Sequence, residues 1–364
     1  MKWQDELRNN ITTLDELAAH IPGIDKNDER AREILEKYPM SISRYYLSLI
    51  NPENEADCIR RMSIPSFSEM DLSGTFDTSG ESSNTKLKGL QHKYPQTVLL
   101  LSTNRCAMYC RYCFRKRMVG SHTEEIVENV EEVFAYIKEH CEINNVLISG
   151  GDSFLLDNDM IERYLSALCS IPHINYIRFG TKTPVVFPQR ITEDTELQDI
   201  LQKYASKKQI YVVTQFNHPL ELTEDALKAV KCLQSLGLIV KNQTVLLKGV
   251  NDTPSVLSDL LQQFTGLGIL PYYIFQCRPV TGVKNQFQVP LQKGYDIIEQ
   301  VKAMQNGNGK CFRYVLSNPD GKVEILGRMD DGRMAFKYHQ AKNPENLGRI
   351  FVKEVPDDMC WVEE

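Results

Sequence analysis

The sequence predicts an α/β fold built on a parallel sheet, and two observations carry this prediction. Between residues 96 and 276, six short runs rich in β-branched and aromatic residues alternate with amphipathic helical runs. Such alternation is typical of parallel β/α packing, and six strands are too few for a closed eight-stranded barrel. The chain is therefore expected to form a partial (β/α)6 TIM-like barrel or an open doubly wound sheet. In either case, a ligand is expected at the carboxyl ends of the strands.

An N-terminal extension, residues 1–90, is predicted to be helical. The run TTLDELAAHI begins at a threonine cap with acidic residues in its first turn, and DERAREILEKY repeats apolar residues at helical spacing. The polar stretch DLSGTFDTSGESSNT, residues 71–85, is rich in glycine, serine and threonine. It is either a solvated connector or an ordered lid.

Residues 91–305 are expected to form the barrel, and residues 306–364 a smaller β-rich segment. The barrel strands are predicted at 96–103, 144–150, 175–181, 209–215, 239–247 and 270–276. The helices between them are predicted at 123–140, 157–168, 193–204, 224–237 and 254–268. In the last segment, RYVLSN, GKVEILG and RMAFKYH are short runs separated by glycine turns, which predicts antiparallel strands.

Composition narrows the class of protein. With a formal net charge of −6, the chain is not expected to bind nucleic acid. The N-terminus MKWQDELRNN lacks the apolar core of a secretory signal, and apolar runs such as TVLLL are too short to cross a bilayer. We therefore expect a cytoplasmic protein that does not enter a membrane. Ten cysteines in that reducing compartment do not imply a disulfide framework.

Three cysteines are spaced like a metal site. Cys106, Cys110 and Cys113 form a C-x3-C-x2-C pattern directly after the first predicted barrel strand. Thiolates held so close repel one another, so a metal centre that neutralises them is expected. One alternative is structural zinc, with His92 or His122 as the fourth ligand. The other is a [4Fe–4S] cluster, in which three protein ligands leave one iron open to a substrate or cofactor.

This pattern resembles the signature of the radical S-adenosylmethionine (SAM) enzymes. In that family the open iron binds the amino and carboxylate groups of SAM, and an electron from the cluster cleaves SAM to a 5′-deoxyadenosyl radical. The resemblance implies a reductant such as flavodoxin or ferredoxin as a partner. It places Tyr112 near the adenine. It also matches Gly150, Gly151 and Asp152 of ISGGD to the family's motif for the SAM ammonium.

Residues 85 to 325 further resemble the lysine 2,3-aminomutase family, through segments such as HKYPQTVLLLSTNRCAMYCRYCFRKR, VLISGGDSFLL and PYYIFQC. Members convert an α-amino acid into its β-isomer with SAM and pyridoxal phosphate. The resemblance implies that Arg115 meets the substrate carboxylate and that Lys182, Arg190 and Gln243 line the active face. It offers Lys322 for the pyridoxal Schiff base, although the family's glycine-rich run before this lysine is shorter here.

Two departures from the family bear on the substrate. Lysine-specific members carry an aspartate for the substrate ammonium just after QC, where this chain has Arg278. Their second aspartate is replaced here by Ser317 and Asn318. Because reversing the charge of a partly buried receptor costs several kcal/mol, lysine should be rejected in favour of an acidic or neutral amino acid.

Three hypotheses about function remain open at this point. The first is a 2,3-aminomutase that uses SAM and pyridoxal phosphate and acts on an acidic or neutral amino acid other than lysine. The second is a radical SAM enzyme of the same scaffold that has lost pyridoxal phosphate and carries out other hydrogen-abstraction chemistry. The third is a non-catalytic metal-binding protein. The resemblance also implies a homo-oligomer with subunit contacts through the N-terminal helices.

Overall fold

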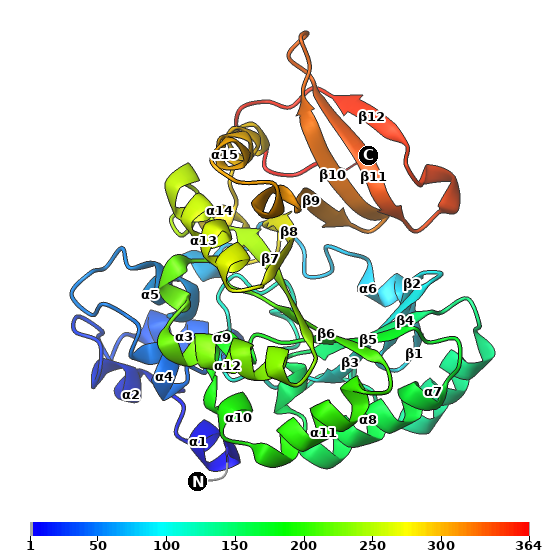
Figure 1. Cartoon of the computed structure of the whole chain (residues 1–364). Helices are drawn as coiled ribbons and strands as arrows, with labels where there is room; N and C mark the ends of the chain where they lie inside the picture. The colour runs from blue at the N-terminus through cyan, green and yellow to red at the C-terminus, as the bar shows by residue number, and fades with distance from the viewer. Residues whose placement is uncertain (1–2, 364) are drawn as a thin grey trace.

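One sheet of twelve strands runs through the computed structural model, which describes residues 3–363. The strands follow one another in chain order, from β1 to β12 (Figure 1). The predicted barrel strands are β3 (Thr97–Thr103), β4 (Asn145–Gly150), β5 (Tyr176–Gly180), β6 (Gln209–Thr214), β7 (Ile239–Leu246) and β8 (Leu270–Gln276). Each is parallel to the next. A doubly wound sheet reverses its strand order at a switch point, so this order leaves the partial barrel as the architecture.

Helices cover the outer face of these strands. The crossovers contain α7 (Val130–Glu139), α8 (Asn158–Ser170), α9 (Thr183–Val186), α10 (Gln189–Thr192), α11 (Thr195–Ala205), α12 (Glu224–Ser235) and α13 (Pro254–Gly266). Along β7, Val240 and Leu246 are buried towards this layer, whereas Lys241, Gln243 and Val245 alternate with them and are only half-buried. The concave face of the barrel therefore carries polar side chains and is the accessible one.

Short helices separated by loops make up the N-terminal segment, residues 3–84. It contains α1 (Trp3–Arg8), α2 (Leu14–Ala18), α3 (Glu29–Lys37), α4 (Arg44–Leu47), α5 (Cys58–Ser63), the 3-10 turn η1 (Phe67–Met70) and α6 (Glu81–Asn84). Two antiparallel strands that were not predicted, β1 (Thr85–Leu87) and β2 (Leu90–Tyr94), then join the edge of β3. Both are short and polar, so their sequence carries little strand signal. The boundary expected near residue 90 lies inside this hairpin.

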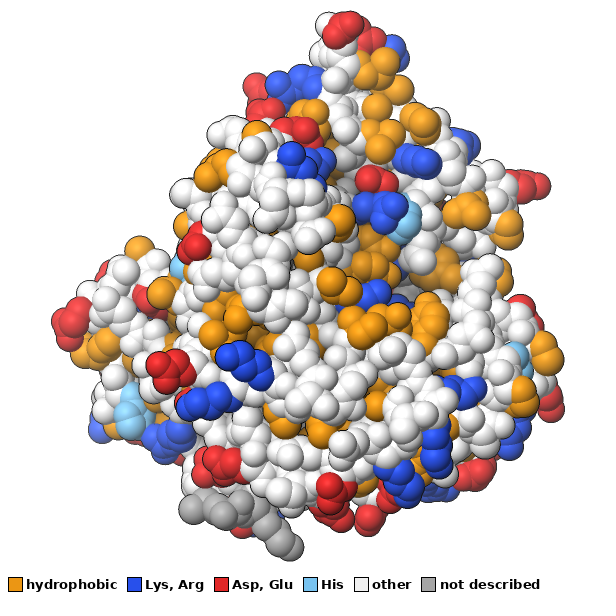
Figure 2. Space-filling model, in the orientation of Figure 1, with side chains coloured by type: hydrophobic (Ala, Val, Ile, Leu, Met, Phe, Trp, Pro, Cys, Tyr) orange, Lys and Arg blue, Asp and Glu red, His pale blue; other side chains and the backbone are white. Residues whose placement is uncertain are grey.

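The chain after β8 continues the same sheet. It forms α14 (Lys284–Phe287) and α15 (Leu291–Ala303), then β9 (Arg313–Asn318), which is parallel to β8. The strands β10 (Gly321–Arg328), β11 (Met334–Ala341) and β12 (Ile350–Lys353) follow in antiparallel order. The three C-terminal strands expected from sequence are thus present, and α15 and β12 are additional. The strands β9 to β12 stand above the barrel strands (Figure 1), and Figure 2 shows a hollow between the two parts in which basic and apolar side chains gather. Within residues 3–363, no helix is long and apolar enough to span a membrane.

Candidate active site

The loop between β3 and α7 contains the three cysteines of the C-x3-C-x2-C pattern. All three are free thiols. Burial raises the pKa of each, to about 11 for Cys110. Burial is the largest cause that raises the pKa of Cys106, and the charge of Asp152 is the second. Cys113 and Cys110 raise this pKa further, so the three sulfur atoms lie near one another. A cluster that binds them as thiolates would remove this mutual repulsion.

The spacing of the thiols tests whether zinc or an iron–sulfur cluster fits. Ligands of one tetrahedral zinc ion lie about 4 Å apart, whereas in residues 3–363 these cysteines do not form a three-residue group within 4.8 Å. Wider spacing fits a polynuclear cluster, in which each thiolate binds a different iron. Among residues 3–363, neither proposed fourth zinc ligand forms a three-residue metal-binding group with the cysteines. His92 contacts Tyr136 and Pro95, and His122 is exposed.

A buried ion-pair cluster fastens the cysteine loop to the N-terminal helices. The carboxylate of Glu69, next to α5, accepts hydrogen bonds from Arg111 Nε at 2.9 Å and from Lys116. Arg111 also donates to the carbonyl oxygen of Pro39 at 2.9 Å. Burial alone would raise the pKa of Glu69, but the two cations outweigh it and lower this pKa. These contacts of the N-terminal extension therefore fix the position of the loop that contains the cysteines.

The glycines of ISGGD allow the cysteine loop to pass close over the end of β4. Gly150 has φ of +119°, and a Cβ atom there would lie 2.3 Å from the carbonyl oxygen of Thr103. A Cβ atom on Gly151 would lie 2.4 Å from the carbonyl oxygen of Arg105. Only glycine fits at both positions.

Asp152, the acid of this motif, holds two strand ends together. Its carboxylate accepts hydrogen bonds from the Phe154 amide at 3.0 Å, from the Lys182 amide at 2.8 Å and from the hydroxyl of Thr181. Burial raises the pKa of this carboxyl, although the hydrogen bonds oppose the shift. Asp152 therefore positions the loops after β4 and β5 beside the cysteines.

Lys182 and Tyr112 lie next to Cys110. The Lys182 ammonium donates to Glu221 Oε1 at 2.7 Å and to the carbonyl oxygen of Gln215 at 2.9 Å. It lies 5.9 Å from the centre of the Tyr112 ring. Among the charges around Cys110, Lys182 is the largest influence that lowers the pKa of this thiol. The structure thus brings both predicted residues to the cysteine site.

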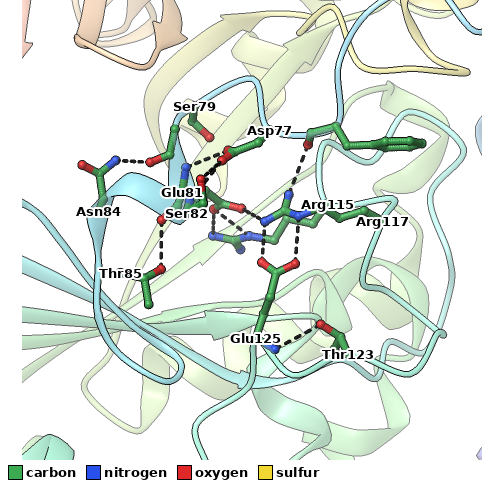
Figure 3. Close-up of polar contacts among 12 residues, drawn as sticks. Asp77, Ser79, Glu81, Ser82, Asn84, Thr85, Arg115, Arg117, Thr123 and Glu125 are labelled. Atoms are coloured by element: carbon green, nitrogen blue, oxygen red, sulfur yellow. Dashed lines mark hydrogen bonds and ion pairs between the residues drawn. The ribbon is translucent and has the colours of Figure 1, made fainter.

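Arg115 is held by a carboxylate that the sequence prediction did not include. Its Nε and Nη2 atoms donate to Glu81 Oε1 at 3.0 and 2.9 Å (Figure 3). Its Nη1 makes longer bonds, 3.3 Å to Ser149 Oγ and 3.2 Å to the Gly150 carbonyl oxygen. Burial would raise the pKa of Glu81, but Arg115 and then Arg117 lower it to about 2. Glu81 is therefore a buried carboxylate that stays ionised.

Glu81 belongs to a polar strap, residues 71–84, which is ordered. Asp77 Oδ1 accepts from the Glu81 amide at 2.7 Å and so begins α6 (Figure 3). The Thr75 amide donates to the carbonyl oxygen of Pro279 at 3.0 Å, which ties the strap to the loop after β8. Of the two interpretations of this polar stretch, the structure supports the ordered lid.

Arg278, in the loop after β8, lies beneath this strap. Its guanidinium carbon is 4.1 Å from the centre of the Phe114 ring, and Arg115 lies 4.7 Å from the same ring. Its Nη1 donates to Ser79 Oγ at 2.6 Å. In the part of the chain that the structure describes, no carboxylate lies within 4.0 Å of it to form a salt bridge. Burial lowers the pKa of Arg278 to about 10.

Lys322 lies on β10, opposite Ser317 of β9. Its ammonium nitrogen is 2.6 Å from Gln340 Oε1 and 5.0 Å from the centre of the Tyr94 ring. Burial, followed by the charges of Arg178, Lys93 and Arg278, lowers the pKa of Lys322 to about 7. A large fraction of this lysine is therefore a neutral amine near pH 7, the form that attacks a carbonyl.

Lys93 of β2 is a second half-buried lysine here, and sequence reasoning missed it. It donates to the carbonyl oxygen of Asn318 at 2.5 Å, and burial followed by Arg278 lowers the pKa of Lys93 to about 7. The amide oxygen of the Asn318 side chain accepts from the Gly321 amide at 2.9 Å and shapes the β9–β10 turn. Only the position of Lys93, just before the first barrel strand, could have drawn attention to it.

Gln243 and Arg190 end up in different places. Gln243 lies on the concave face of β7, in register with Tyr273 of β8. Arg190 is not brought to this site. Its guanidinium donates to the Phe154 carbonyl oxygen at 2.9 Å and to Asp194 at 2.5 Å, and it lies 4.4 Å from the Trp3 ring.

Comparison with known proteins identifies the family. The model of the radical SAM superfamily matches residues 100–256. A protein of Aquifex aeolicus is 41% identical over 93% of this chain and 91% of its own length. The L-lysine 2,3-aminomutase of Clostridium subterminale is 37% identical over 88% of this chain and 76% of its own length. This chain belongs to the radical SAM lysine 2,3-aminomutase family. The glutamate 2,3-aminomutase of Clostridioides difficile is also similar, at 38% identity over 88% of this chain and 74% of its own length.

Membership in the lysine 2,3-aminomutase family confirms the expected class of enzyme, a radical SAM isomerase. Enzymes of this family use a [4Fe–4S] cluster and SAM, and pyridoxal phosphate is characteristic of the lysine 2,3-aminomutases. Named members of the family act on lysine and on glutamate. The scaffold therefore accommodates substrates whose side chains carry opposite charges.

Proposed function

We propose that this protein is a 2,3-aminomutase for an amino acid with an acidic or neutral side chain, glutamate being the simplest case. Cys106, Cys110 and Cys113 would hold the cluster, and Lys322 would hold pyridoxal phosphate. When bound, the cluster and SAM supply a hydrogen-abstracting radical, and pyridoxal phosphate supplies a carbonyl that carries the migrating nitrogen. A reductant such as flavodoxin or ferredoxin delivers the electron.

The observation that carries the substrate assignment is Arg278. A half-buried guanidinium that forms no salt bridge within the described residues is stabilised by a further anion and destabilised by a second cation. At about 5 Å and an effective dielectric constant of about 20, a unit charge interacts with it by ~3 kcal/mol. A substrate carboxylate at this point gains that amount, whereas the ammonium of lysine loses it. Because the two effects differ in sign, Arg278 discriminates strongly between the two substrates.

The charges on the concave face support pyridoxal phosphate as well. Within residues 3–363, Arg178, Lys241 and Arg278 have no carboxylate within 4.0 Å, and neither do Lys93 and Lys322, whose pKa values of about 7 leave them partly protonated. A dianionic phosphate together with a substrate carboxylate would offset most of this positive charge. A neutral Lys322 amine is already prepared to condense with the pyridoxal carbonyl.

Glu81 decides how Arg115 can meet the substrate. It occupies the Nε–Nη2 edge of the guanidinium, and the contacts of Nη1 are the longer ones. The α-carboxylate of the substrate is therefore proposed to approach at the Nη1–Nη2 edge, where it can accept two hydrogen bonds. Glu81 acts through Arg115 and is a positioning residue.

The proposal is tested with anaerobically reconstituted protein supplied with SAM, pyridoxal phosphate and dithionite. Glutamate, aspartate, glutamine, alanine and lysine are offered in turn, and β-amino acid products are identified by mass spectrometry. An acidic or neutral substrate is expected to turn over, with lysine at least about 100-fold slower. Lysine as the best substrate contradicts the proposed role of Arg278. Borohydride reduction that leaves no pyridoxyl group on Lys322 contradicts the cofactor assignment.

A further inference from the structure

A group of metal-binding side chains lies outside the barrel mouth. His92 belongs to β2, His140 follows the last residue of α7, and Glu142 comes two residues later in the turn towards β4. One ligand atom from each residue lies within 4.8 Å of the others. No other set of three histidine, cysteine or carboxylate residues in 3–363 meets this distance. The two histidines are half-buried and Glu142 is exposed, so water can reach the group.

The hydrogen bonds of His92 define its tautomer. Its Nε2 lies 3.1 Å from the carbonyl oxygen of Pro95, which can only accept, so Nε2 carries the proton. The lone pair is therefore on Nδ1, which lies 2.9 Å from the Tyr136 hydroxyl. Histidines that bind metals almost always donate their other ring N–H to a carboxylate or backbone carbonyl. The Pro95 carbonyl supplies this support.

The second imidazole is also held in place. The His140 ring lies 4.0 Å from the Tyr136 ring, with an angle of 31° between the two planes. It lies 5.7 Å from the His92 ring, nearly perpendicular to it at 82°. Its Nδ1 is 2.8 Å from Glu142 Oε1. The three ligands are therefore oriented by contacts that exist without an ion.

We propose that His92, His140 and Glu142 bind a single divalent zinc-type cation, at a site separate from the cysteine loop. Two imidazoles and one carboxylate are a ligand set that suits zinc, and the exposed side of the group leaves room for water as a further ligand. Cobalt and nickel would bind to the same ligands, with affinities that follow the usual order for divalent metals.

The position of this site gives the cation a structural effect. His92 is on the strand that pairs with β3, and His140 ends the helix of the β3–β4 crossover. The cysteine loop and α7 both lie between β3 and β4 in the chain. A cation bound by these residues would therefore connect β2, which pairs with β3, to the C-terminal end of α7 in the β3–β4 crossover. Since only the folded chain brings the ligands together, the cation should raise the melting temperature.

The test uses protein whose cluster has been reconstituted, so that the cysteines are occupied before zinc is added. After equilibrium dialysis against micromolar zinc, metal analysis should find one zinc per chain in addition to iron. His140→Ala, His92→Gln and Glu142→Gln should each weaken zinc binding about tenfold or more. His122→Ala, a change of an exposed histidine outside the group, should leave zinc binding unchanged. Iron content and SAM cleavage should stay unchanged in all four variants.

Thermal unfolding provides the second readout. Zinc should raise the melting temperature of the unmodified protein and of His122→Ala, but not that of His140→Ala. Glu142→Gln changes an exposed side chain, so it remains informative if a histidine variant fails to fold. The proposal is overturned if the unmodified protein holds no more zinc than His140→Ala. It is equally overturned if zinc content is lost in Cys110→Ala and retained in the histidine variants.

Discussion

Two regions lie at the barrel mouth, the cysteine loop and the group formed by Lys322, Lys93 and Arg278, which is called the lysine pocket below. They are assembled differently. The cysteine loop takes its three thiols from eight consecutive residues, Cys106 to Cys113. The lysine pocket takes Lys322 from β10, Lys93 from β2 and Arg278 from the loop after β8. A local motif can therefore be damaged without disturbing the pocket, whereas the pocket depends on the pairing of distant strands. Substitutions at four residues test this difference between the two regions.

Cys110→Ala should abolish SAM cleavage, because it removes a cluster ligand that no neighbouring residue can replace. Iron content and 5′-deoxyadenosine production are measured after anaerobic reconstitution. Cys232→Ala, a change of a half-buried cysteine on α12, should retain both. Undiminished 5′-deoxyadenosine production by Cys110→Ala would exclude the cysteine loop as the cluster site.

Lys322→Ala should lower isomerisation by roughly 100-fold or more while the cluster still binds SAM, since it removes only the amine for the cofactor. Two measurements distinguish the regions: the pyridoxyl adduct after borohydride treatment should be lost, whereas SAM binding should be retained. Lys337→Ala on β11 is the matched control.

The titration of Lys322 gives this second prediction a pH dependence. Because its pKa is lowered to about 7, the amine is mostly protonated below that pH and mostly neutral above it. Incorporation of pyridoxal phosphate into cofactor-free protein should accelerate as pH rises through 7 and then level off. The cost of burying the charged lysine is largest below pH 7 and disappears as pH approaches the unfolded value near 10.5. A rate independent of pH between 6 and 8 would contradict a neutral amine in the pocket.

Arg278→Asp should reverse the preference between substrates, because it exchanges an anion receptor for a cation receptor. Turnover of an acidic substrate should fall by about 100-fold, and turnover of lysine should rise. Arg278→Gln removes the charge without reversing it, so its preference between acidic substrate and lysine should lie between those of the unmodified protein and Arg278→Asp. If all three proteins rank the amino acids in the same order, the side chain of the substrate does not meet this residue.

Glu81→Gln tests the strap that covers both regions. It leaves Arg115 without its ionised partner, so KM should rise and kcat/KM should fall by roughly tenfold. Glu125→Gln, which removes a carboxylate paired only with Arg117, should change kcat/KM less. An unchanged KM would indicate that Arg115 does not meet the substrate.

Stability gives an independent readout of the same pair. Since the pKa of Glu81 is lowered to about 2, its ionised form stabilises the folded protein fully above pH 4.5. This contribution is lost as pH falls from 4.5 through 2. Denaturant unfolding of Glu81→Gln should therefore show a weaker loss of stability across that pH interval than the unmodified protein.

The barrel strands and the metal pattern could be predicted because their signals are local. Each strand from β3 to β8 is a short apolar run between helices, and the three thiols lie within one loop. The edge strands β1 and β2 could not be predicted, because their polar side chains carry no such signal. Their place depends on the pairing of β2 with β3 and of β1 with β2. The doubly wound alternative also needed the observed strand order to exclude it.

The parallel β/α architecture and the cysteine loop follow from residues that are close together in the chain, and the sequence also places an arginine at position 278. The contact of Glu81 with Arg115, the contact of Lys93 with Asn318 and the distance of Arg190 from the site are set by the folded chain. Such contacts join segments whose distance in space depends on strand register and loop packing. The charge and protonation of Lys322 depend on the same packing, because burial and neighbouring cations set its pKa.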